Sequence, residues 1–235
     1  MTTFTTSDRE EAYKEILEKA PYQPGYEDAI VQGTDDWHKL RLGKVTASRV
    51  ADVLSKGKSG ESASRRNYRI ELVAQRLTNK PSESFTNAAM EWGTATEPLA
   101  RVAYELHTNS DVSQVAFVDH PNVEWFGCSP DGIVGKGLVE IKCPNTTTHL
   151  DWMEEGKAPS KHIPQMMAQM ACTGAEWCDF VSFDPRLPED LQLFVVRVNR
   201  DQEYIDNMEV EVKKFLDEVE MTINKLKERK YWLTR

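Results

Sequence analysis

Two carboxylates and a lysine stand close together in the second half of the chain. Glu140 and Lys142 flank Ile141 in an apolar run, and Asp131 lies nine residues before Glu140. Because side chains alternate along a strand, Glu140 and Lys142 are predicted to point to the same face. A hairpin turn at Gly135-Lys136-Gly137 would bring Asp131 alongside Glu140. The spacing therefore predicts that the three charged groups converge on one spot.

Such a cluster suits metal-assisted chemistry on a phosphate group. Mg²⁺ prefers oxygen ligands, and one or two carboxylates suffice because the ion keeps water and shares phosphate oxygens. The peptide carbonyl of Ile141 is a further candidate ligand. Lys142 beside a metal-bound water would orient or deprotonate it and would balance charge that builds on phosphate.

The same residues also have an ordinary structural interpretation. Most Asp-Gly pairs, such as Asp131-Gly132, are turns, and a Glu-x-Lys on a strand usually faces solvent. Here, however, Glu140 and Lys142 interrupt the apolar run 138–143, which is typical of a buried strand. Buried charges need partners or a metal, so the context favours the catalytic interpretation.

The elements that would position these residues form a helical first half followed by alternating strands and helices. Apolar periodicity and turn signals predict helices over 8–19, 36–42, 47–54, 64–77, 87–107, 163–173 and 201–230. The predicted strands are 112–118, 126–128, 132–134, 138–143, 177–183 and 191–198, and 55–64 is predicted to be a mobile loop. This order predicts an α/β domain with a mixed central β-sheet flanked by helices.

Composition narrows the class of protein. The 235 residues include 29 Lys and Arg against 38 Asp and Glu, a net charge of −9, and 40% are hydrophobic, which argues against disorder. No apolar run is long enough to span a bilayer, and the polar start carries no secretory signal. We therefore expect a soluble intracellular protein with four reduced cysteines and no membrane partner. The acidity does not exclude DNA, because a binding groove is a local feature.

Several longer segments, taken together, resemble a known family. Pro130-Asp131 followed by Glu140-x-Lys142 resembles the PD-(D/E)xK nuclease signature. More specifically, about residues 35–185, most of the chain, resemble the lambda-exonuclease-like (YqaJ) viral recombinases. The supporting segments are WHKLRLG at 37–43 with TAS at 46–48, WG at 92–93 followed by Glu97, CSPDG at 128–132, 138–144, and QMMAQMACTG at 165–174. The resemblance implies a restriction-endonuclease-like fold in a single exonuclease domain, 1–235. Within it, 1–34 is expected to be a helical extension, 35–200 the nuclease core and 201–235 a C-terminal helix.

The resemblance also assigns roles by position. Asp131 and Glu140 would bind metal with the carbonyl of Ile141, and Lys142 would act on the attacking water. Three further residues would complete the catalytic set: Glu97 beside the metals, Gln165 positioning the nucleophile or the lysine, and Asp119 as another acidic position. The gap from Asp119 to Asp131 is slightly longer here than in the family.

A second group of residues matches positions that contact DNA. Arg41, Ser48 and Ser129 fall where the family holds the terminal 5′-phosphate, and a guanidinium with two hydroxyls suits that ligand. His162 stands where the family has a tyrosine, so an imidazole would contact phosphate there. Met90 would either wedge apart the terminal base pair or simply pack.

The activity that the resemblance implies is 5′→3′ digestion of one strand of linear double-stranded DNA from 5′-phosphorylated ends. Mg²⁺ would be the cofactor, with Mn²⁺ able to substitute. The implied assembly is a homotrimeric ring that supplies 3′ tails to a single-strand annealing protein. The implied setting is the cytoplasm of a bacterial host, with the protein encoded by a phage or prophage. The alternatives are a site-specific or structure-specific endonuclease of the same fold, and a non-catalytic DNA-binding protein.

Other charged and aromatic residues leave their roles open. Lys56, Lys58, Arg65 and Arg66 would either contact the DNA backbone or be solvated. Trp37 and Trp92 are expected to anchor the core. The four histidines His38, His107, His120 and His149 show no metal-ligand spacing and are expected at the surface or in loops.

Overall fold

The computed structural model describes residues 30–58, 60–82 and 87–232. The predicted helix over 8–19 and almost all of the predicted extension 1–34 lie outside these residues. Within the described part of the chain, no helix is both long enough and apolar enough to cross a membrane.

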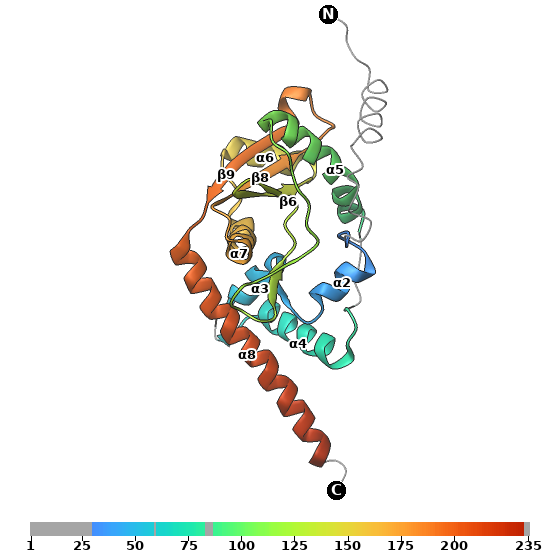
Figure 1. The fold of residues 1–235 in the computed structure, drawn as a ribbon, viewed down its shortest axis with the longest axis vertical. Coiled ribbons are helices and arrows are strands. Elements are labelled where there is room, and N and C mark those ends of the chain that lie inside the picture. Colours follow the sequence, from blue (N-terminus) through green and yellow to red (C-terminus); the bar gives the residue numbers. More distant parts are fainter. Residues whose placement is uncertain (1–29, 59, 83–86, 233–235) are drawn as a thin grey trace, which may run out of the picture.

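Helices dominate the first part of the described chain, and strands alternate with helices afterwards (Figure 1). The α-helices are α2 (Asp35–Arg41), α3 (Val50–Leu54), α4 (Ala63–Thr78), α5 (Ala88–Thr108), α6 (Thr146–Glu155), α7 (Ile163–Thr173) and α8 (Gln202–Trp232). The strands are β1 (Val45–Thr46), β2 (Lys56–Gly57), β3 (Gly60–Glu61), β4 (Val118–Asp119), β5 (Phe126–Cys128), β6 (Gly132–Val134), β7 (Gly137–Lys142), β8 (Trp177–Phe183) and β9 (Leu193–Asn199). Short 3₁₀ turns η1 (Ala47–Arg49), η2 (Ser160–His162) and η3 (Glu189–Leu191) connect some of them.

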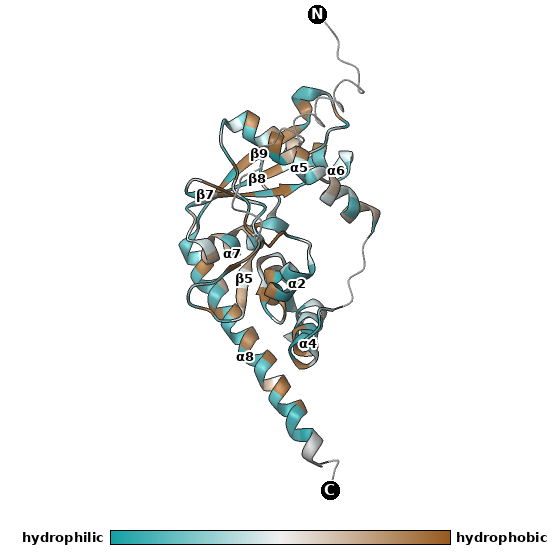
Figure 2. Cartoon of the chain, turned by 45° about the vertical axis from the view of Figure 1, so that its right-hand side comes forward, coloured by the Kyte–Doolittle hydropathy of each residue, from teal (hydrophilic) through white to brown (hydrophobic). Residues whose placement is uncertain are grey.

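The largest sheet has four strands in the order β6-β7-β8-β9. β6 and β7 form the antiparallel hairpin, β7 and β8 run parallel, and β9 returns antiparallel. Alternate residues of β7 serve two cores: Leu138 packs in the cluster that contains α7 and α8, whereas Val139 and Ile141 pack against residues of α5. The prediction of a mixed sheet flanked by helices is confirmed (Figures 1 and 2).

A second, three-stranded sheet has the order β1-β5-β4. The predicted strand over 112–118 is wrong, because only Val118–Asp119 forms a strand. The two ends of that segment pair with different sheets: Ser113 bridges to Ile133 of β6, and Val118 pairs with Cys128 of β5. The segment therefore crosses from one sheet to the other and cannot form one continuous ladder.

Two local elements differ from the sequence-based expectations. Helix α6 was not predicted, and the reason is its sparse apolar pattern, since it buries only His149 and Trp152. The expected mobile loop 55–64 contains the two-residue strands β2 and β3, which pair with each other.

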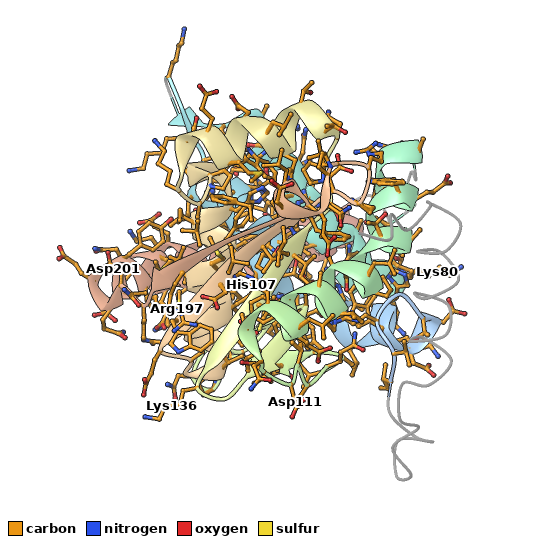
Figure 3. All side chains as sticks on the ribbon, turned by 90° about the horizontal axis from the view of Figure 1, so that it is seen from above. Lys80, His107, Asp111, Lys136, Arg197 and Asp201 are labelled. Atoms are coloured by element: carbon orange, nitrogen blue, oxygen red, sulfur yellow. The ribbon has the colours of Figure 1, made fainter. Side chains whose placement is uncertain are left out.

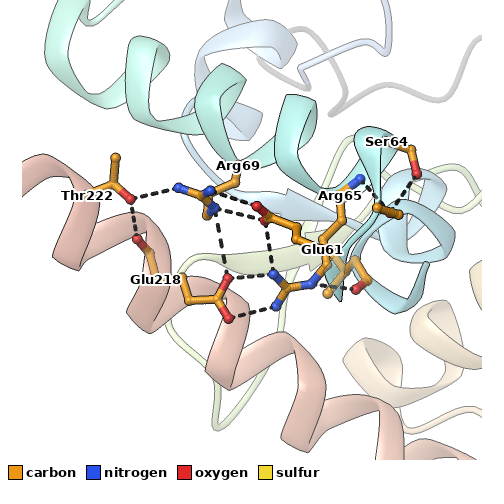
Figure 4. Close-up of polar contacts among 8 residues, drawn as sticks. Glu61, Ser64, Arg65, Arg69, Glu218 and Thr222 are labelled. Carbon is orange, nitrogen blue, oxygen red and sulfur yellow. Dashed lines mark hydrogen bonds and ion pairs between the residues drawn. The ribbon is translucent and has the colours of Figure 1, made fainter. Parts of the chain in front are cut away.

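The Arg65 guanidinium is bound by other residues of the protein, so it is not available to contact DNA. Its guanidinium donates to both carboxylate oxygens of Glu218 on α8, at 2.5 and 3.0 Å. Arg69 donates to Thr222 of α8 and to Glu61 of β3 (Figure 4). These contacts connect β3, α4 and α8. We call this group of residues, Glu61, Arg65, Arg69, Glu218 and Thr222, the seam.

Two histidines expected at the surface are buried. His149 has no exposed surface, and its ring nitrogens contact the Ser182 hydroxyl at 2.7 Å and the Leu191 carbonyl at 2.9 Å. His120 lies against Glu209 at 3.1 Å and accepts the backbone N–H of Val123. Each ring finds partners for its nitrogens, so burial costs little and both residues serve the fold.

Candidate active site

Strand β7 carries the centre of the site. Glu140 and Lys142 lie two residues apart on this strand, and Asp131 directly precedes β6. One carboxylate oxygen of Asp131, Oδ2, accepts the backbone N–H of Ile141 at 2.6 Å. Since Ile141 is the neighbour of Glu140, this bond fixes Asp131 against the strand. The hairpin thus brings the three charged residues together as the sequence predicts.

Both oxygens of the Glu140 carboxylate have partners. The Lys142 ammonium donates to Oε1, and the side-chain amide of Gln169 on α7 donates to Oε2 at 2.6 Å. Glu140 and Gln169 have no exposed surface, while the Lys142 side chain is 30% exposed. The buried carboxylate is therefore held on both sides, and the site opens to solvent on the lysine side.

The glutamine that reaches the carboxylate is Gln169, one helical turn beyond the predicted Gln165. Gln165 is half-buried and makes no side-chain hydrogen bond within the described part of the chain. The sequence reasoning missed Gln169 because it stands inside the apolar helix 163–173. The available signal was a polar side chain on the buried face of that helix.

Burial and neighbouring charges shift the pKa values of Asp131 and Lys142. Burial raises the pKa of Asp131 well above its usual range, and the nearby charges of Glu140 and Glu97 raise it further. Burial alone would lower the pKa of Lys142, but Glu140, Asp131 and Glu97 outweigh it and hold that pKa above its ordinary value. Glu97, on α5, belongs to the same electrostatic neighbourhood and pairs with Arg101 at 2.6 Å.

The donor set fits a small hard cation. Asp131 and Glu140 supply carboxylate oxygens beside the Ile141 peptide, and a cation there would relieve the repulsion between the two buried acids. Among the described residues, no three acidic, cysteine or histidine side chains are grouped closely enough to hold a metal. A site with two carboxylates suits Mg²⁺, which keeps several waters, better than an ion that needs an all-protein cage.

A second polar centre surrounds Arg41 at the end of α2. Its guanidinium donates to the Ser129 hydroxyl at 3.1 Å and stacks on the Trp37 ring at 4.0 Å. The Trp37 indole N–H donates to the same hydroxyl at 2.9 Å, and Ser129 donates to the Ala116 carbonyl at 2.7 Å. Ser129 stands two residues before Asp131, so this centre adjoins the carboxylates.

Arg41, Ser48 and Met90 line one open cavity of about 720 Å³. Ser48 is exposed in η1, with its hydroxyl 3.2 Å from that of Thr46. Met90, near the start of α5, is 52% exposed. The structure therefore groups two predicted phosphate contacts with the predicted wedge, and Arg41 links them to the third contact, Ser129.

Two predicted residues make no hydrogen bond to the carboxylate cluster within the described part of the chain. Asp119 is exposed on β4 and pairs with Lys44 at 2.6 Å. His162 stacks on Phe180, 5.5 Å between ring centres, and its Nε2 is buried without a hydrogen-bond partner in the described part of the chain. Burial and the charge of Lys142 lower the pKa of His162 to about 4, so the ring is neutral at physiological pH.

The family model described as the YqaJ-like viral recombinase domain matches residues 36–176, well over half of the chain. The chain belongs to this family. The matched range contains the whole carboxylate and lysine cluster, its glutamine partner and the Arg41 centre. No curated protein matches the YqaJ-like chain.

Solved structures agree with the family assignment. The alkaline exonuclease LHK-Exo from Laribacter hongkongensis is 51% identical, with a TM-score of 0.79, covering 85% of this chain and all of that one. LHK-Exo in complex with dAMP gives the same identity and coverage and a TM-score of 0.80. A phage-related exonuclease from Haemophilus somnus 129PT, 17% identical, has a TM-score of 0.65 over 80% of this chain and 99% of its own, which shows the shared fold.

Proposed function

We propose that this YqaJ-like protein is a Mg²⁺-dependent exonuclease that digests one strand of linear duplex DNA in the 5′→3′ direction. The observation that carries the proposal is the buried Glu140 carboxylate held between Lys142 and Gln169, with Asp131 bonded to the next peptide. The 51% identity to the alkaline exonuclease LHK-Exo supports the proposal of an exonuclease.

Asp131, Glu140 and the Ile141 carbonyl would hold Mg²⁺, or Mn²⁺ in its place. The bound ion would polarise the phosphate and activate a water molecule. Lys142 reaches from the solvent side, so its ammonium orients the attacking water and balances charge on the phosphate. Gln169 keeps Glu140 in one orientation by donating to the oxygen that Lys142 does not contact.

Arg41, Ser129 and Ser48 would hold the terminal 5′-phosphate. A planar guanidinium offers two parallel donors to phosphate oxygens, and stacking on Trp37 keeps that plane fixed. Met90 at the same cavity would wedge against the terminal base pair. Capture of the 5′ end next to the carboxylates gives the 5′→3′ direction, because hydrolysis then begins at the 5′-terminal nucleotide.

The resemblance to the family supports a proposal for the wider setting. The products would be 3′ single-stranded tails for a single-strand annealing protein, made by a homotrimeric ring in the cytoplasm of a bacterial host. We propose a phage or prophage origin for the same reason.

The test compares circular and linear forms of one plasmid in Mg²⁺. The proposal expects digestion of the linear, 5′-phosphorylated form and no change in the supercoiled form, with EDTA abolishing digestion. Cutting of the supercoiled form would instead indicate an endonuclease, and binding without cutting would indicate a non-catalytic DNA-binding protein.

A further inference from the structure

We propose that Arg186 contacts a backbone phosphate of the cut strand on the 3′ side of the bond being hydrolysed. This inference rests on the proposed exonuclease function and deepens it. Arg186 follows β8 in a turn and belongs neither to the carboxylate cluster nor to the Arg41 centre.

The protein holds the Arg186 guanidinium in place from three sides. Its Nε and Nη2 donate to the two carboxylate oxygens of Asp184 at 2.7 and 2.9 Å, and Nη2 also donates to the Pro144 carbonyl at 3.1 Å. The guanidinium carbon lies 4.4 Å from the centre of the Trp92 ring. Asp184 has no exposed surface and accepts a further bond from Thr146 at 2.6 Å.

This anchoring leaves one side of the guanidinium available. Nη1 donates no hydrogen bond to any described residue, and 45% of the Arg186 side chain is exposed. A guanidinium that is already fixed loses little conformational entropy when it binds a ligand. The ligand that matches a free N–H pair on a planar cation is an oxyanion such as a phosphate.

The position of Arg186 relative to the catalytic cluster follows from the topology. The β6-β7 pairing ends, on the side away from the turn, at Gly132 and Val139. Beyond this pair the two strands are no longer paired with each other. The chain before Asp131 leads through Ser129 into the β1-β5-β4 sheet, and the chain after Lys142 leads to Pro144 at the end of β8.

Arg41 donates a hydrogen bond to Ser129 in the segment that precedes Asp131, and Arg186 donates one to the Pro144 carbonyl in the segment that follows Lys142. The carboxylates lie where these two segments diverge. A strand whose 5′-phosphate is at Arg41 and whose scissile phosphate is at the carboxylates would therefore present its next phosphate toward Arg186.

The chain contains a matched control for this arginine. Arg197 on β9 donates to both oxygens of the buried Asp179, at 2.8 and 2.9 Å, and stacks on Trp177 at 3.5 Å. Trp177 packs against Gly137 at the hairpin end of β7. Arg197 and Lys136, a residue of the hairpin turn, are labelled in Figure 3. Arg197 thus repeats the construction of Arg186 at the opposite end of the strand that carries Glu140 and Lys142.

The experiment compares two double variants that each remove one arginine and its buried acid. They are Asp184→Asn with Arg186→Gln, and Asp179→Asn with Arg197→Gln, so that neither leaves a buried charge unpaired. Initial kcat/KM is measured in Mg²⁺ on 5′-phosphorylated duplexes that are either unmodified or carry one neutral methylphosphonate at the linkage 3′ of the first scissile bond. Unfolding temperatures are recorded for all three proteins.

On the methylphosphonate duplex, we expect kcat/KM to fall roughly tenfold or more for wild type and for the double variant at Asp179 and Arg197, the size of one charge-assisted contact. The double variant at Asp184 and Arg186 should have a kcat/KM lower by a similar factor on the unmodified duplex, and this value should fall little further on the modified duplex. Equal losses on the modified duplex in all three proteins would overturn the assignment of Arg186. Failure of wild type to digest the unmodified duplex would instead refute the exonuclease function itself.

Discussion

At the scale of single residues, the site places several charged groups close together in a buried position, where burial destabilises their charges. Glu140 is completely buried, and burial together with the nearby charge of Glu140 raises the pKa of Asp131. Lys142 and Gln169 offset part of that cost with hydrogen bonds to Glu140. In the proposed function, a bound cation would offset the remaining negative charge.

The first prediction concerns Asp131→Asn in protein freed of metal. The amide oxygen can still accept the Ile141 N–H, while a buried negative charge next to Glu140 disappears. We expect the melting temperature in EDTA to rise by a few degrees, consistent with about 1 kcal/mol of relieved repulsion. Differential scanning calorimetry with and without Mg²⁺ measures this, and Mg²⁺ should stabilise wild type more than the variant. A variant that melts lower in EDTA would show that the Asp131 charge supports the fold.

A second prediction concerns Arg41→Lys. Lysine keeps the positive charge but loses the planar fork and the stack on Trp37, and it should slow digestion of 5′-phosphorylated ends by roughly ten- to hundredfold. Duplexes with 5′-hydroxyl ends should be slowed much less. The measurement is the initial rate on two duplexes that differ only in that phosphate, with Lys39→Ala, an exposed lysine of the same helix, as the control. Equal slowing on both duplexes would assign Arg41 to general DNA affinity or to structure.

At the scale of elements, the seam between α4 and α8 connects the long C-terminal helix to the body of the protein (Figure 4). Arg65 is 13% exposed and donates to Glu218, Glu61 and the Val53 carbonyl. Within the described part of the chain, the seam residues make no hydrogen bond to Asp131, Glu140 or Lys142, so we expect the seam to contribute to stability rather than to chemistry.

The third prediction follows from this seam. Arg65→Met should lower the free energy of unfolding by about 1–2 kcal/mol, less than for a fully buried pair because Glu218 is 41% exposed and can be solvated. Urea denaturation measures the loss. Lys214→Met, which removes an exposed pair with Glu211 on the same helix, should cost at most about 0.5 kcal/mol. Similar losses in the two variants would mean that the seam adds no stability.

The sequence predicts most of the elements that build the site, because their signals are local. The apolar run with Glu140 and Lys142 and the glycine turn define the β6-β7 hairpin, which the structure confirms. Segment 112–118 was predicted wrongly, since its apolar residues look like a strand although its ends pair with separate sheets. Gln169 and Arg186 could not be assigned from spacing, because their contacts join segments far apart in the chain.

At the scale of the whole molecule, the net charge of −9 has to be reconciled with a DNA substrate. In the proposed function, binding depends on local cations. Arg41 contacts Ser129 in the segment before Asp131, and Arg186 contacts Pro144 in the segment after Lys142. A ring that encloses the duplex would confine DNA by its shape as well as by charge, and its acidic exterior would disfavour binding outside the channel.

The fourth prediction is that the protein in solution is a trimer. Light scattering coupled to size-exclusion chromatography should give a mass three times that of one chain, at concentrations down to those used in nuclease assays. Processive digestion of long linear DNA should accompany it, because an enclosed duplex cannot dissociate sideways. A monomeric mass together with processive digestion would contradict the ring.

The most direct test of the central claim uses a linear duplex with a 5′-phosphate on both strands, one strand labelled in that phosphate and the other at its 3′ end. In Mg²⁺ the account predicts early release of the 5′ label as a mononucleotide, while the 3′ label stays in a strand that shortens progressively. Lys142→Met should release neither label yet bind the duplex with nearly the wild-type affinity. Early release of the 3′ label as a mononucleotide, or wild-type turnover by Lys142→Met, would contradict a 5′→3′ exonuclease that works through Asp131, Glu140 and Lys142.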